Sequence, residues 1–479
     1  MSLFLILALP LLASAVALVF LRDRRAPEIA TVLSAVAVLA LAVNSALEVA
    51  SGRQVVGVAD WLALDGFGAL ILLVVAVVGS SAALFSLGYM GRREDADRRA
   101  GSYYIHFNLF FFSLLLVPMS VEAALAWVAI ELTALFSVLL VGFDNTHGAL
   151  EAAWKYIVMM FTGAAIALLG FFILFAALEK GGGGPYTWEV LRAAAPRMPP
   201  VLVESASLLI LIGLGVKVGL VPLHTWLPDA HSQAPSPICA VLSGVKTTTA
   251  LAVVLRLVPL LPEHRVQPWL MAIGLISVGA AAFLVLQVRD YKRLFAYSTV
   301  EHMGIIFVAA GVGTAAGNYG AMFQIVTHSV TKSFCFLAAG ATLLTVETRE
   351  IAAVRGLIRT SPVAGAALLL GGLAIAGAPP MAVFLSEFSI FKTGLTGGHY
   401  AVIGLLALFI TIAFIGILLH VNWLVFGPSK DRGPRSKVAL PASCVLALGL
   451  AVVPVLVLGV YLPEPIHQLM LAAAAALAR

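Results

Sequence analysis

Charged side chains are scarce in this sequence. Asp, Glu, Lys and Arg account for 11% of the 479 residues, whereas a soluble protein has about 25%. A surface that faces water needs more charge than this, so an ordinary soluble domain is excluded. The small net charge of +5 is better explained by anchoring at one membrane face than by an acidic partner. We therefore expect no contact with nucleic acid.

Cysteine is also rare, and the common cofactor motifs are missing. Cys239, Cys335 and Cys444 are scattered and no C-x-x-C occurs, which argues against an iron–sulfur or zinc site. No G-x-x-x-x-G-K-[ST] motif is present, so direct use of ATP is not indicated. We expect no cofactor, no metal and no redox centre belonging to this chain.

Long apolar runs, by contrast, are plentiful. Apolar residues make up 61% of the chain, and many runs reach about 20 residues, the length of a helix that spans a bilayer. The sequence therefore predicts an all-α polytopic membrane protein. The first run has no basic residues before it, which is typical of a membrane span rather than a cleaved signal peptide. The fourteen predicted spans cover residues 2–20, 28–50, 62–90, 102–118, 121–143, 150–178, 202–227, 237–258, 267–288, 296–313, 318–345, 362–396, 400–426 and 438–461.

The connections between the spans are short, and their basic residues are distributed unevenly. The longest connection covers residues 180–200, and the tail after Pro465 is predicted to be a short interfacial helix. One side of the predicted topology carries Arg22, Arg24, Arg25, Arg92, Arg93, Arg98, Arg99, Arg289, Lys292, Arg293, Arg349, Arg355, Arg359, Lys430, Arg432, Arg435 and Lys437. The other side carries chiefly Arg53, Lys180, Arg192, Arg197, Arg265 and Arg479. The positive-inside rule makes the first side cytoplasmic and puts both termini outside, in a bacterial inner membrane.

Seven ionisable side chains fall inside the apolar runs. They are Glu131, Lys217, Lys246, His302, His328, Lys332 and Glu387. Insertion scales assign each charge a cost of roughly 2.5–3.5 kcal/mol at the bilayer centre. Packing does not plausibly repay several such costs, so we expect these groups to face one another or a hydrated interior.

Structural roles stay open for several of these residues. Glu131 and Lys217 can form an ion pair that only holds two helices, Lys246 can extend to an interface, and His302, His328 and Lys332 can bond neighbouring helices. Two membrane histidines can also ligate a haem, although a haem does not explain the lysines. Five further candidates, for auxiliary proton transfer or for anchoring, are Lys155, His224, Asp229, His231 and Lys392.

Taken together, the seven groups have the chemistry of a proton path. Burial lowers the affinity of a lysine for its proton, and a nearby carboxylate restores it. A Glu–Lys pair whose separation changes therefore acts as a proton switch. Histidine supplies a relay group near neutral pH.

Two spans contain prolines that interrupt the helix. Pro222 follows Lys217 by about one turn, and Pro379-Pro380 precedes Glu387 by seven residues. Proline disturbs the preceding turn, and the freed backbone groups are tolerated where protein or water covers them. Paired broken helices predict two inverted five-helix repeats. These cover residues 96–260 (spans four to eight) and 261–430 (spans nine to thirteen), between an N-terminal part, 1–95, and a C-terminal part, 431–479.

Three stretches resemble a known family. HTWLPDAHSQAPSPICAVLSGVKT, WVAIELTALFSVLLVGF and RDYKRLFAYSTVEHMGIIF are similar to the antiporter-like subunits of respiratory complex I, Mrp cation/proton antiporters and membrane-bound [NiFe] hydrogenases. The resemblance covers about residues 60–430. It implies fourteen helices with the seventh and twelfth broken. It also implies that Glu131, Lys217, Lys246, His302, His328, Lys332 and Glu387 line the central proton axis.

The strings HSVTKSFCFLAAG and GAPPMAVFLSEF look most like the F-type subunit of hydrogenase-4 and formate hydrogenlyase. This implies a proton-translocating subunit of a redox-driven pump, with other membrane subunits, a cytoplasmic redox module and lipids as partners. A complex I subunit, a Na⁺(K⁺)/H⁺ antiporter subunit and a non-transporting scaffold remain alternatives. An axis of lysine and histidine disfavours bare cations, which require oxygen ligands.

Overall fold

The protein is an almost wholly helical bundle. The computed structural model describes residues 2–57, 61–428 and 439–477. Up to residue 260 the elements are α1 (Ser2–Val19), α2 (Arg25–Ala50), β1 (Val55–Val56), β2 (Ala63–Leu64), α3 (Gly66–Gly91), α4 (Ala96–Met119), α5 (Ala123–Val141), α6 (His147–Lys180), α7 (Trp188–Ala194), η1 (Ala195–Arg197), α8 (Pro200–Val218), α9 (Trp226–Gln233), α10 (Ser236–Val241), η2 (Leu242–Lys246), α11 (Thr247–Leu255) and η3 (Val258–Leu260). The later elements are α12 (Glu263–Val285), α13 (Tyr291–Gly311), α14 (Ala315–Val346), η4 (Ile351–Ala353), α15 (Leu357–Thr360), α16 (Pro362–Ile375), α17 (Ala382–Thr396), α18 (Tyr400–Phe426), α19 (Ala442–Val460) and α20 (Glu464–Ala476).

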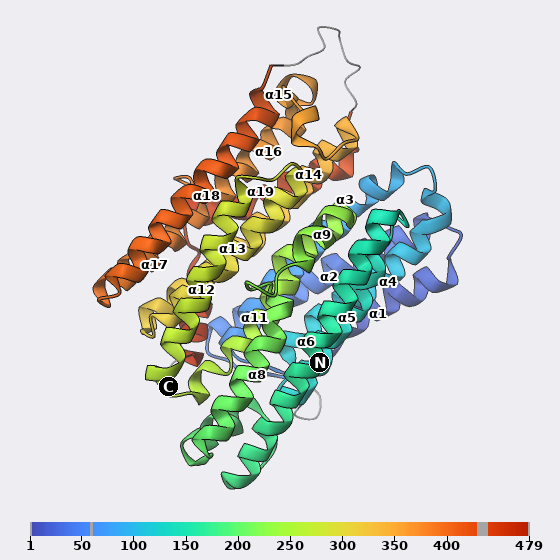
Figure 1. Ribbon diagram of the computed structural model, residues 1–479. Helices are drawn as coiled ribbons and strands as arrows, with labels where there is room; N and C mark the ends of the chain where they lie inside the picture. The colour runs from blue at the N-terminus through green and yellow to red at the C-terminus, as the bar shows by residue number, and fades with distance from the viewer. Residues whose placement is uncertain (1, 58–60, 429–438, 478–479) are drawn as a thin grey trace.

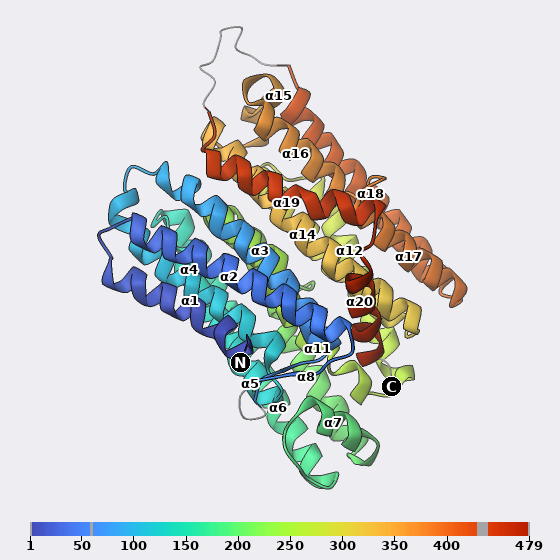
Figure 2. The same cartoon turned by 180° about the vertical axis from the view of Figure 1, so that it is seen from behind.

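Most helices lie side by side along one common direction (Figures 1 and 2). Within the described residues, 13 helical segments are long and apolar enough to cross a membrane. The predicted twelfth span, 362–396, is not among them, because it is made of two shorter helices, α16 and α17. The only strands among the described residues, β1 and β2, form an antiparallel pair in which Val55 lies opposite Leu64. The prediction of an all-α polytopic membrane protein is confirmed.

Three predicted spans differ from the helices in the structure. Span 202–227 is interrupted as predicted, but the break comes before Pro222: α8 ends at Val218, where Gly219 adopts a left-handed conformation with φ of +87°. Span 237–258 begins as α10, passes through a π-helical turn, η2, and continues as α11. Span 362–396 is interrupted after α16, where Gly377 has φ of +74°. Glycine is the residue that tolerates such a conformation.

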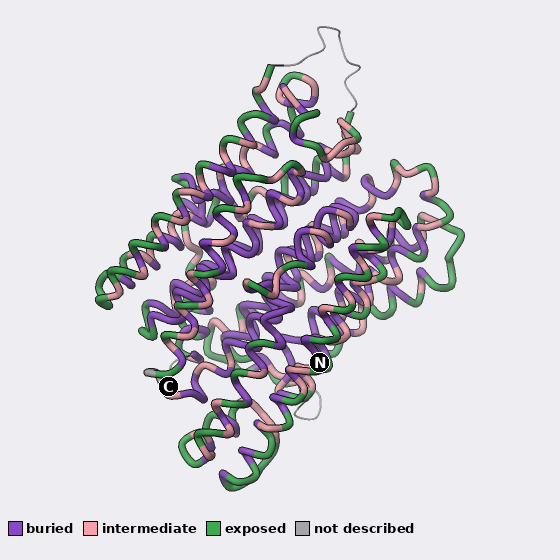
Figure 3. The backbone as a smooth tube through the Cα atoms, viewed as in Figure 1, coloured by how far each residue is buried: buried purple, intermediate pink, exposed green. Residues whose placement is uncertain are grey.

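The buried core follows the central helices rather than the ends of the chain. Every residue in the most apolar window of Ser236–Leu260 is buried, against 28% in that of α18. Figure 3 shows the same division, with buried backbone inside and exposed backbone along the outer helices. The outer helices therefore present their apolar side chains to lipid, and the central helices hold the polar groups.

Small residues allow the central helices to approach closely. A β-carbon added at Gly304 on α13 would lie 2.6 Å from the carbonyl oxygen of Gly274 on α12, and the reverse distance is also 2.6 Å. Such contacts are the usual way in which membrane helices pack without a hydrophobic driving force. The close crossing holds α13, which carries part of the polar axis, firmly in place.

The basic residues of the predicted cytoplasmic side gather at one end of the bundle. Arg24 reaches Asp97, and Arg93 pairs with Asp144 at 2.6 Å. Both termini lie toward the opposite end in Figures 1 and 2, as an even number of crossings requires. Five of the predicted cations lie outside the described residues, namely Lys430, Arg432, Arg435, Lys437 and Arg479. The division into two inverted repeats stays a prediction.

Candidate functional site

The first group of buried polar residues joins α5 to the end of α8. Lys217 is fully buried, and its Nζ donates to Oε2 of Glu131 at 3.0 Å. Lys217 lies two residues before the left-handed Gly219 that ends α8. The other carboxylate oxygen of Glu131, Oε1, is buried and has no hydrogen-bond partner in the described part of the chain. The pair is thus half satisfied, and Glu131 retains an oxygen that can accept a proton.

The broken end of α8 is satisfied by side chains. Trp226 donates its indole N–H to the carbonyl oxygen of Val216 at 2.7 Å, and the N–H of Val221 donates to Oγ of Ser277 at 3.1 Å. Unpaired backbone groups at membrane depth are costly, so these bonds explain how the break persists. They also fix Trp226 next to the lysines.

Lys246 occupies a different environment from Lys217. It ends the π-helical turn η2, and such turns inside α-helices frequently mark functional positions. Its Nζ lies 4.2 Å from the centre of the Trp226 ring and 5.1 Å from that of Tyr156. It also contacts Sδ of Met160 at 3.2 Å and the carbonyl oxygen of Lys217 at 3.5 Å. Aromatic faces stabilise an ammonium less than a carboxylate does, so this lysine is well placed to release its proton.

Two histidines form the centre of the axis. The rings of His302 on α13 and His328 on α14 are 5.2 Å apart. Nε2 of His302 donates to the carbonyl oxygen of Ile375 at 3.1 Å, while its Nδ1 accepts from the amide of Gln324 at 3.1 Å. This makes His302 the neutral Nε2–H tautomer and leaves neither nitrogen free as a haem ligand.

His328 has one free nitrogen. Its Nε2 donates to the carbonyl oxygen of Ser243 at 3.2 Å, three residues before Lys246 on the same turn. Its Nδ1 is buried and has no partner among the described residues. His328 therefore links the Lys246 region to His302 and has an open position for a proton.

A chain of uncharged polar groups continues from His302 toward Glu387. Gln324 bonds His302 through its amide nitrogen and accepts from Oγ of Ser386 on α17 at 2.5 Å. Glu387 is the next residue and is 6% exposed. The left-handed Gly377 leaves room for its carboxylate, because a β-carbon there would lie 2.5 Å from Oε2 of Glu387. The break between α16 and α17 thus positions Glu387 at the end of the chain.

Lys332 bonds to α13, which also carries Glu301, an acidic residue that is not among the predicted site residues. Its Nζ donates to the carbonyl oxygen of Phe295 at 2.6 Å and also to Oγ of Ser298, both on α13. Glu301, one turn beyond Ser298 on the same helix, is 3% exposed, and its Oε2 has no partner in the described chain. Glu301 lies inside a predicted span, directly before His302. An acidic residue at such a position is the sequence signal that could have identified it as a candidate.

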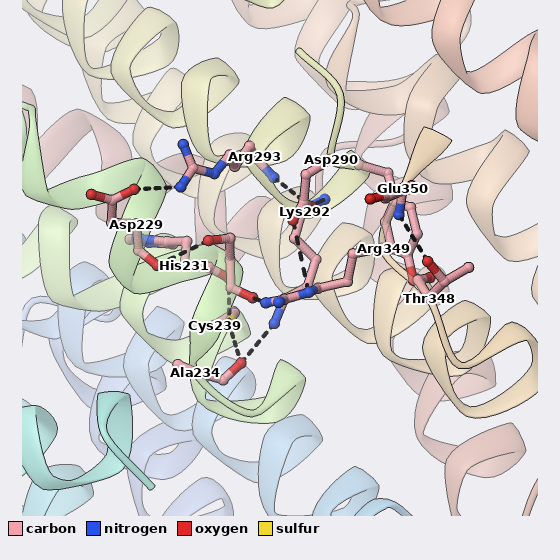
Figure 4. A network of polar contacts seen from close by, with 12 residues as sticks. Asp229, His231, Ala234, Cys239, Asp290, Lys292, Arg293, Thr348, Arg349 and Glu350 are labelled. Carbon is pink, nitrogen blue, oxygen red and sulfur yellow. Dashed lines mark hydrogen bonds and ion pairs between the residues drawn. The ribbon is translucent and has the colours of Figure 1, made fainter. Parts of the chain in front are cut away.

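Two auxiliary candidates, Lys155 and Asp229, belong to a network at the predicted cytoplasmic end. Asp229 on α9 pairs with Lys155 at 3.1 Å and with Arg293 at 2.5 Å. Figure 4 shows how Arg293, Lys292 and Arg349 reach across to α9 and the segment that follows it. These bonds fasten the short helix α9 to the ends of α13 and α14, so Asp229 has an anchoring position.

Lys292 corrects one expectation. It is counted among the basic residues of a connection between spans, but it lies in the first turn of α13, is 1% exposed and donates to the carbonyl oxygen of Ala234 at 2.6 Å. The reason is that α13 begins at Tyr291 and buries its first turn against the segment after α9. The sequence pattern showed the end of a span but not the element packed against it.

The remaining auxiliary residues are divided between interior and surface. His231 is fully buried, with Nδ1 donating to the carbonyl oxygen of Leu227 at 2.7 Å and with Nε2 unpartnered among the described residues. His224 is partly buried beside Tyr297, at a ring distance of 6.5 Å. Lys392, on α17, is exposed.

The fold is shared with subunits of known membrane complexes. It matches a chain of the membrane-bound sulfane sulfur reductase, an archaeal respiratory membrane complex, with a TM-score of 0.89 and 25% identity over 100% of this chain and 98% of that one. It matches a chain of the Mrp complex from Dietzia sp. DQ12-45-1b with a TM-score of 0.87 and 21% identity, over 99% and 97% of the two chains.

Sequence comparison gives the family. The chain is 37% identical to a hydrogenase-4 component F homolog of Methylacidiphilum infernorum, over 85% of this chain and 86% of the relative. It is 30% identical to hydrogenase-4 component B of Escherichia coli, over 69% of this chain but only 50% of that relative. The predicted likeness to the F-type subunit is confirmed. Residues 120–414 match the model of the NADH:quinone oxidoreductase/Mrp antiporter transmembrane family, and the chain belongs to that family.

Proposed function

We propose that this chain carries protons across the membrane as the translocating subunit of a redox-driven pump of the hydrogenase type. One observation carries the proposal. Buried polar groups follow one another from Glu131 through Lys217, Lys246 and His328 to His302, and then through Gln324 to Ser386, the residue before Glu387. A line of titratable and hydrogen-bonding groups through otherwise apolar helices is what proton transfer requires and what a scaffold has no use for.

The path has a switch at one end and an acid at the other. Protons are taken up from the cytoplasmic side near Lys217 and Lys246, pass the two histidines and Lys332, and leave near Glu387. Glu131 controls Lys217 through the 3.0 Å ion pair, because the lysine holds its proton when the carboxylate is close and releases it when the carboxylate withdraws. Moving one charge against about 100 mV costs roughly 2.3 kcal/mol, which a redox reaction supplies.

The partners and orientation are part of the same proposal. Hydrogenase-4 components and subunits of respiratory and Mrp complexes are the relatives of this chain, and they support an assembly with other membrane subunits. A peripheral redox module on the cytoplasmic side then supplies the energy. The concentration of arginine at one end of the bundle supports a bacterial inner membrane with both termini outside.

Lys246→Ala tests the proposal in the intact complex reconstituted into liposomes. Proton uptake per electron should fall by at least about 100-fold, because a positioned proton carrier contributes that much or more. Electron transfer itself should persist under uncoupled conditions. Lys180→Ala, at an exposed lysine at the end of α6, is the control and should pump normally.

Two results would contradict the proposal. Normal pumping by the Lys246→Ala complex would mean that the chain is a scaffold. A pH change that appears only with Na⁺ or K⁺ would instead identify cation/proton exchange, the alternative raised by the 26% identity to Na⁺/H⁺ antiporter subunit A1 of Staphylococcus aureus. No cluster of three or more acidic, histidine or cysteine side chains suited to a metal ion occurs in the described residues, which favours protons.

A further inference from the structure

Glu301 is a buried acid that the path described so far does not use. It lies on α13, where 94% of the most apolar window is buried, and its own exposure is 3%. No cation lies within 4.0 Å of it among the described residues, and its Oε2 has no hydrogen-bond partner there. An isolated carboxylate in such a place is strongly disfavoured, so Glu301 needs either a proton or a nearby positive charge.

Lys332 supplies that nearby charge. Its Nζ is held at 2.6 Å from the carbonyl oxygen of Phe295 and by Oγ of Ser298. Ser298 and Glu301 are three residues apart and therefore share one face of α13. The lysine amine thus lies against the face of α13 that carries the carboxylate, about one helical turn from it. A separation of this size suits transfer through a bridging water rather than a fixed ion pair.

Glu387 is the next acid near this part of α13. Its helix, α17, packs against both α13 and α14. Its carboxylate lies against Gly377, two residues after Ile375, whose carbonyl oxygen accepts from His302, the neighbour of Glu301. Two carboxylates in one low-dielectric region oppose simultaneous ionisation, so the two acids favour holding one proton between them. No lysine or arginine is paired with Glu387 in the described chain, so no salt bridge offsets the repulsion between the two carboxylates.

We propose that Glu301 carries protons between Lys332 and Glu387, as an additional member of the path. In the step, the Lys332 ammonium gives its proton to the Glu301 carboxylate, leaving a neutral amine and a neutral carboxylic acid. The acid then gives the proton to the Glu387 carboxylate and returns to its ionised form. The proposal rests on the proton-translocating function proposed above, and it adds a second acid on α13 to the outward half of the path.

This arrangement gives His302 and Glu301 different tasks. His302 has both ring nitrogens occupied, by Ile375 and Gln324, and takes up a proton only after one of these bonds breaks. Glu301 has a free oxygen and a lysine beside it, and needs no such rearrangement. The outward half can therefore receive protons through Lys332 and Glu301 while the His302–Gln324–Ser386 chain holds α13, α14 and α17 together.

Glu301→Gln tests the proposal, because it keeps the shape of the side chain but cannot exchange a proton. In the reconstituted complex, the proton-to-electron ratio should fall by about tenfold or more. Glu301→Asp keeps a shortened carboxyl group and should pump measurably more than Glu301→Gln. In redox-induced infrared difference spectra, the carboxylic-acid C=O band of the native complex should shift in Glu301→Asp and disappear in Glu301→Gln.

Glu28→Gln is the matched control. Glu28 is also a buried membrane-helix glutamate, at 9% exposure, but it pairs with Arg24 at 2.8 Å on α2, outside the path. The control should keep the native ratio and the native infrared band. If Glu301→Gln does not assemble, the Glu301→Asp spectrum decides, and an unshifted band there overturns the proposal.

Comparison with Lys246→Ala separates the two proposals. Loss of pumping in Lys246→Ala together with a native ratio in Glu301→Gln would overturn the role of Glu301 alone. Native pumping in Lys246→Ala would overturn the translocating function itself. Loss in both variants supports both proposals.

Discussion

At the scale of single residues, the two lysines of the first half differ in their partners. Lys217 has a carboxylate at 3.0 Å, whereas Lys246 has aromatic rings and a thioether. The pair holds a proton on Lys217, and the rings hold one on Lys246 only weakly. In the proposed mechanism, a proton moves forward when Glu131 and Lys217 separate, because the charge on Lys217 then has no counter-ion.

Asp65 allows a residue-scale prediction outside the membrane. It accepts from the N–H of Gly68 at 2.6 Å as the N-cap of α3, and it receives both terminal nitrogens of Arg256, at 2.8 and 2.9 Å. Asp65→Ala removes the cap and the pair, and should lower the free energy of unfolding by about 1–2 kcal/mol. Thermal unfolding in detergent measures this. Asp97→Ala, at an exposed carboxylate 4.0 Å from Arg24, should change it by less than about 0.5 kcal/mol.

The same residue gives the expected pH dependence. Burial by itself raises the pKa of Asp65, but the Arg256 guanidinium and the Gly68 amide outweigh it and hold that pKa below the ordinary value of 3.8. The resulting stability is complete above the ordinary value and is lost as the pH falls through the lower value of the folded chain. Asp65→Ala should therefore unfold with a weaker dependence on acid than the native chain, and equal dependence would contradict this account.

At the scale of elements, the two helix breaks determine where charges lie. Gly219 ends α8 just after Lys217, and Gly377 precedes the helix that carries Glu387. At each break the freed carbonyls are taken by side chains from elsewhere, Trp226 in one case and His302 in the other. The breaks are therefore fixed parts of the bundle that open space next to a titratable group.

Gly377→Ala tests the role of the second break. The added methyl group meets Oε2 of Glu387 at 2.5 Å, so it should displace the carboxylate and reduce proton pumping by about tenfold or more. Gly398→Ala is the control, because Gly398 also has positive φ, +80°, but nothing lies within 4 Å of the new methyl group. Both variants carry backbone strain of about 1 kcal/mol. Equal pumping by the two would show that Glu387 does not depend on the break.

At the scale of the whole molecule, burial and basic charge vary along different axes of the bundle. Burial increases from the outer helices α1 and α18 toward α13 and the α10–α11 segment, across the membrane plane. Basic side chains accumulate at one end, along the membrane normal. The first gradient creates an interior for polar groups, and the second predicts which end faces the cytoplasm.

Side-specific labelling tests this orientation. Cys239, Cys335 and Cys444 are buried, so the native chain should not react with a membrane-impermeant maleimide. Cysteine introduced at exposed Ser51 should react in intact cells, because that end is predicted to face outward. Cysteine introduced at exposed Glu94 should react only after the membrane is opened. The opposite pattern would reverse the orientation and the direction of the proposed path.

The sequence alone determined the class of the protein, the two broken helices and most of the buried ionisable residues. Each of these depends on local properties, namely the length of an apolar run, the effect of proline, and the cost of a charge inside a span. The tertiary structure decided which groups meet. Glu131 and Lys217 are 86 residues apart, and His328 and Ser243 are 85 apart.

Three features could be found only in the assembled bundle. The aromatic surroundings of Lys246, the burial of Lys292, and the bonds from Lys332 to the helix that carries Glu301 all arise where helices distant in sequence pack together. A periodic apolar pattern shows that a residue lies in the membrane, but not which neighbour compensates its charge. That neighbour decides whether a buried charge holds its proton or passes it on, because the energy of a charge in a low-dielectric interior depends on the groups within a few ångströms of it.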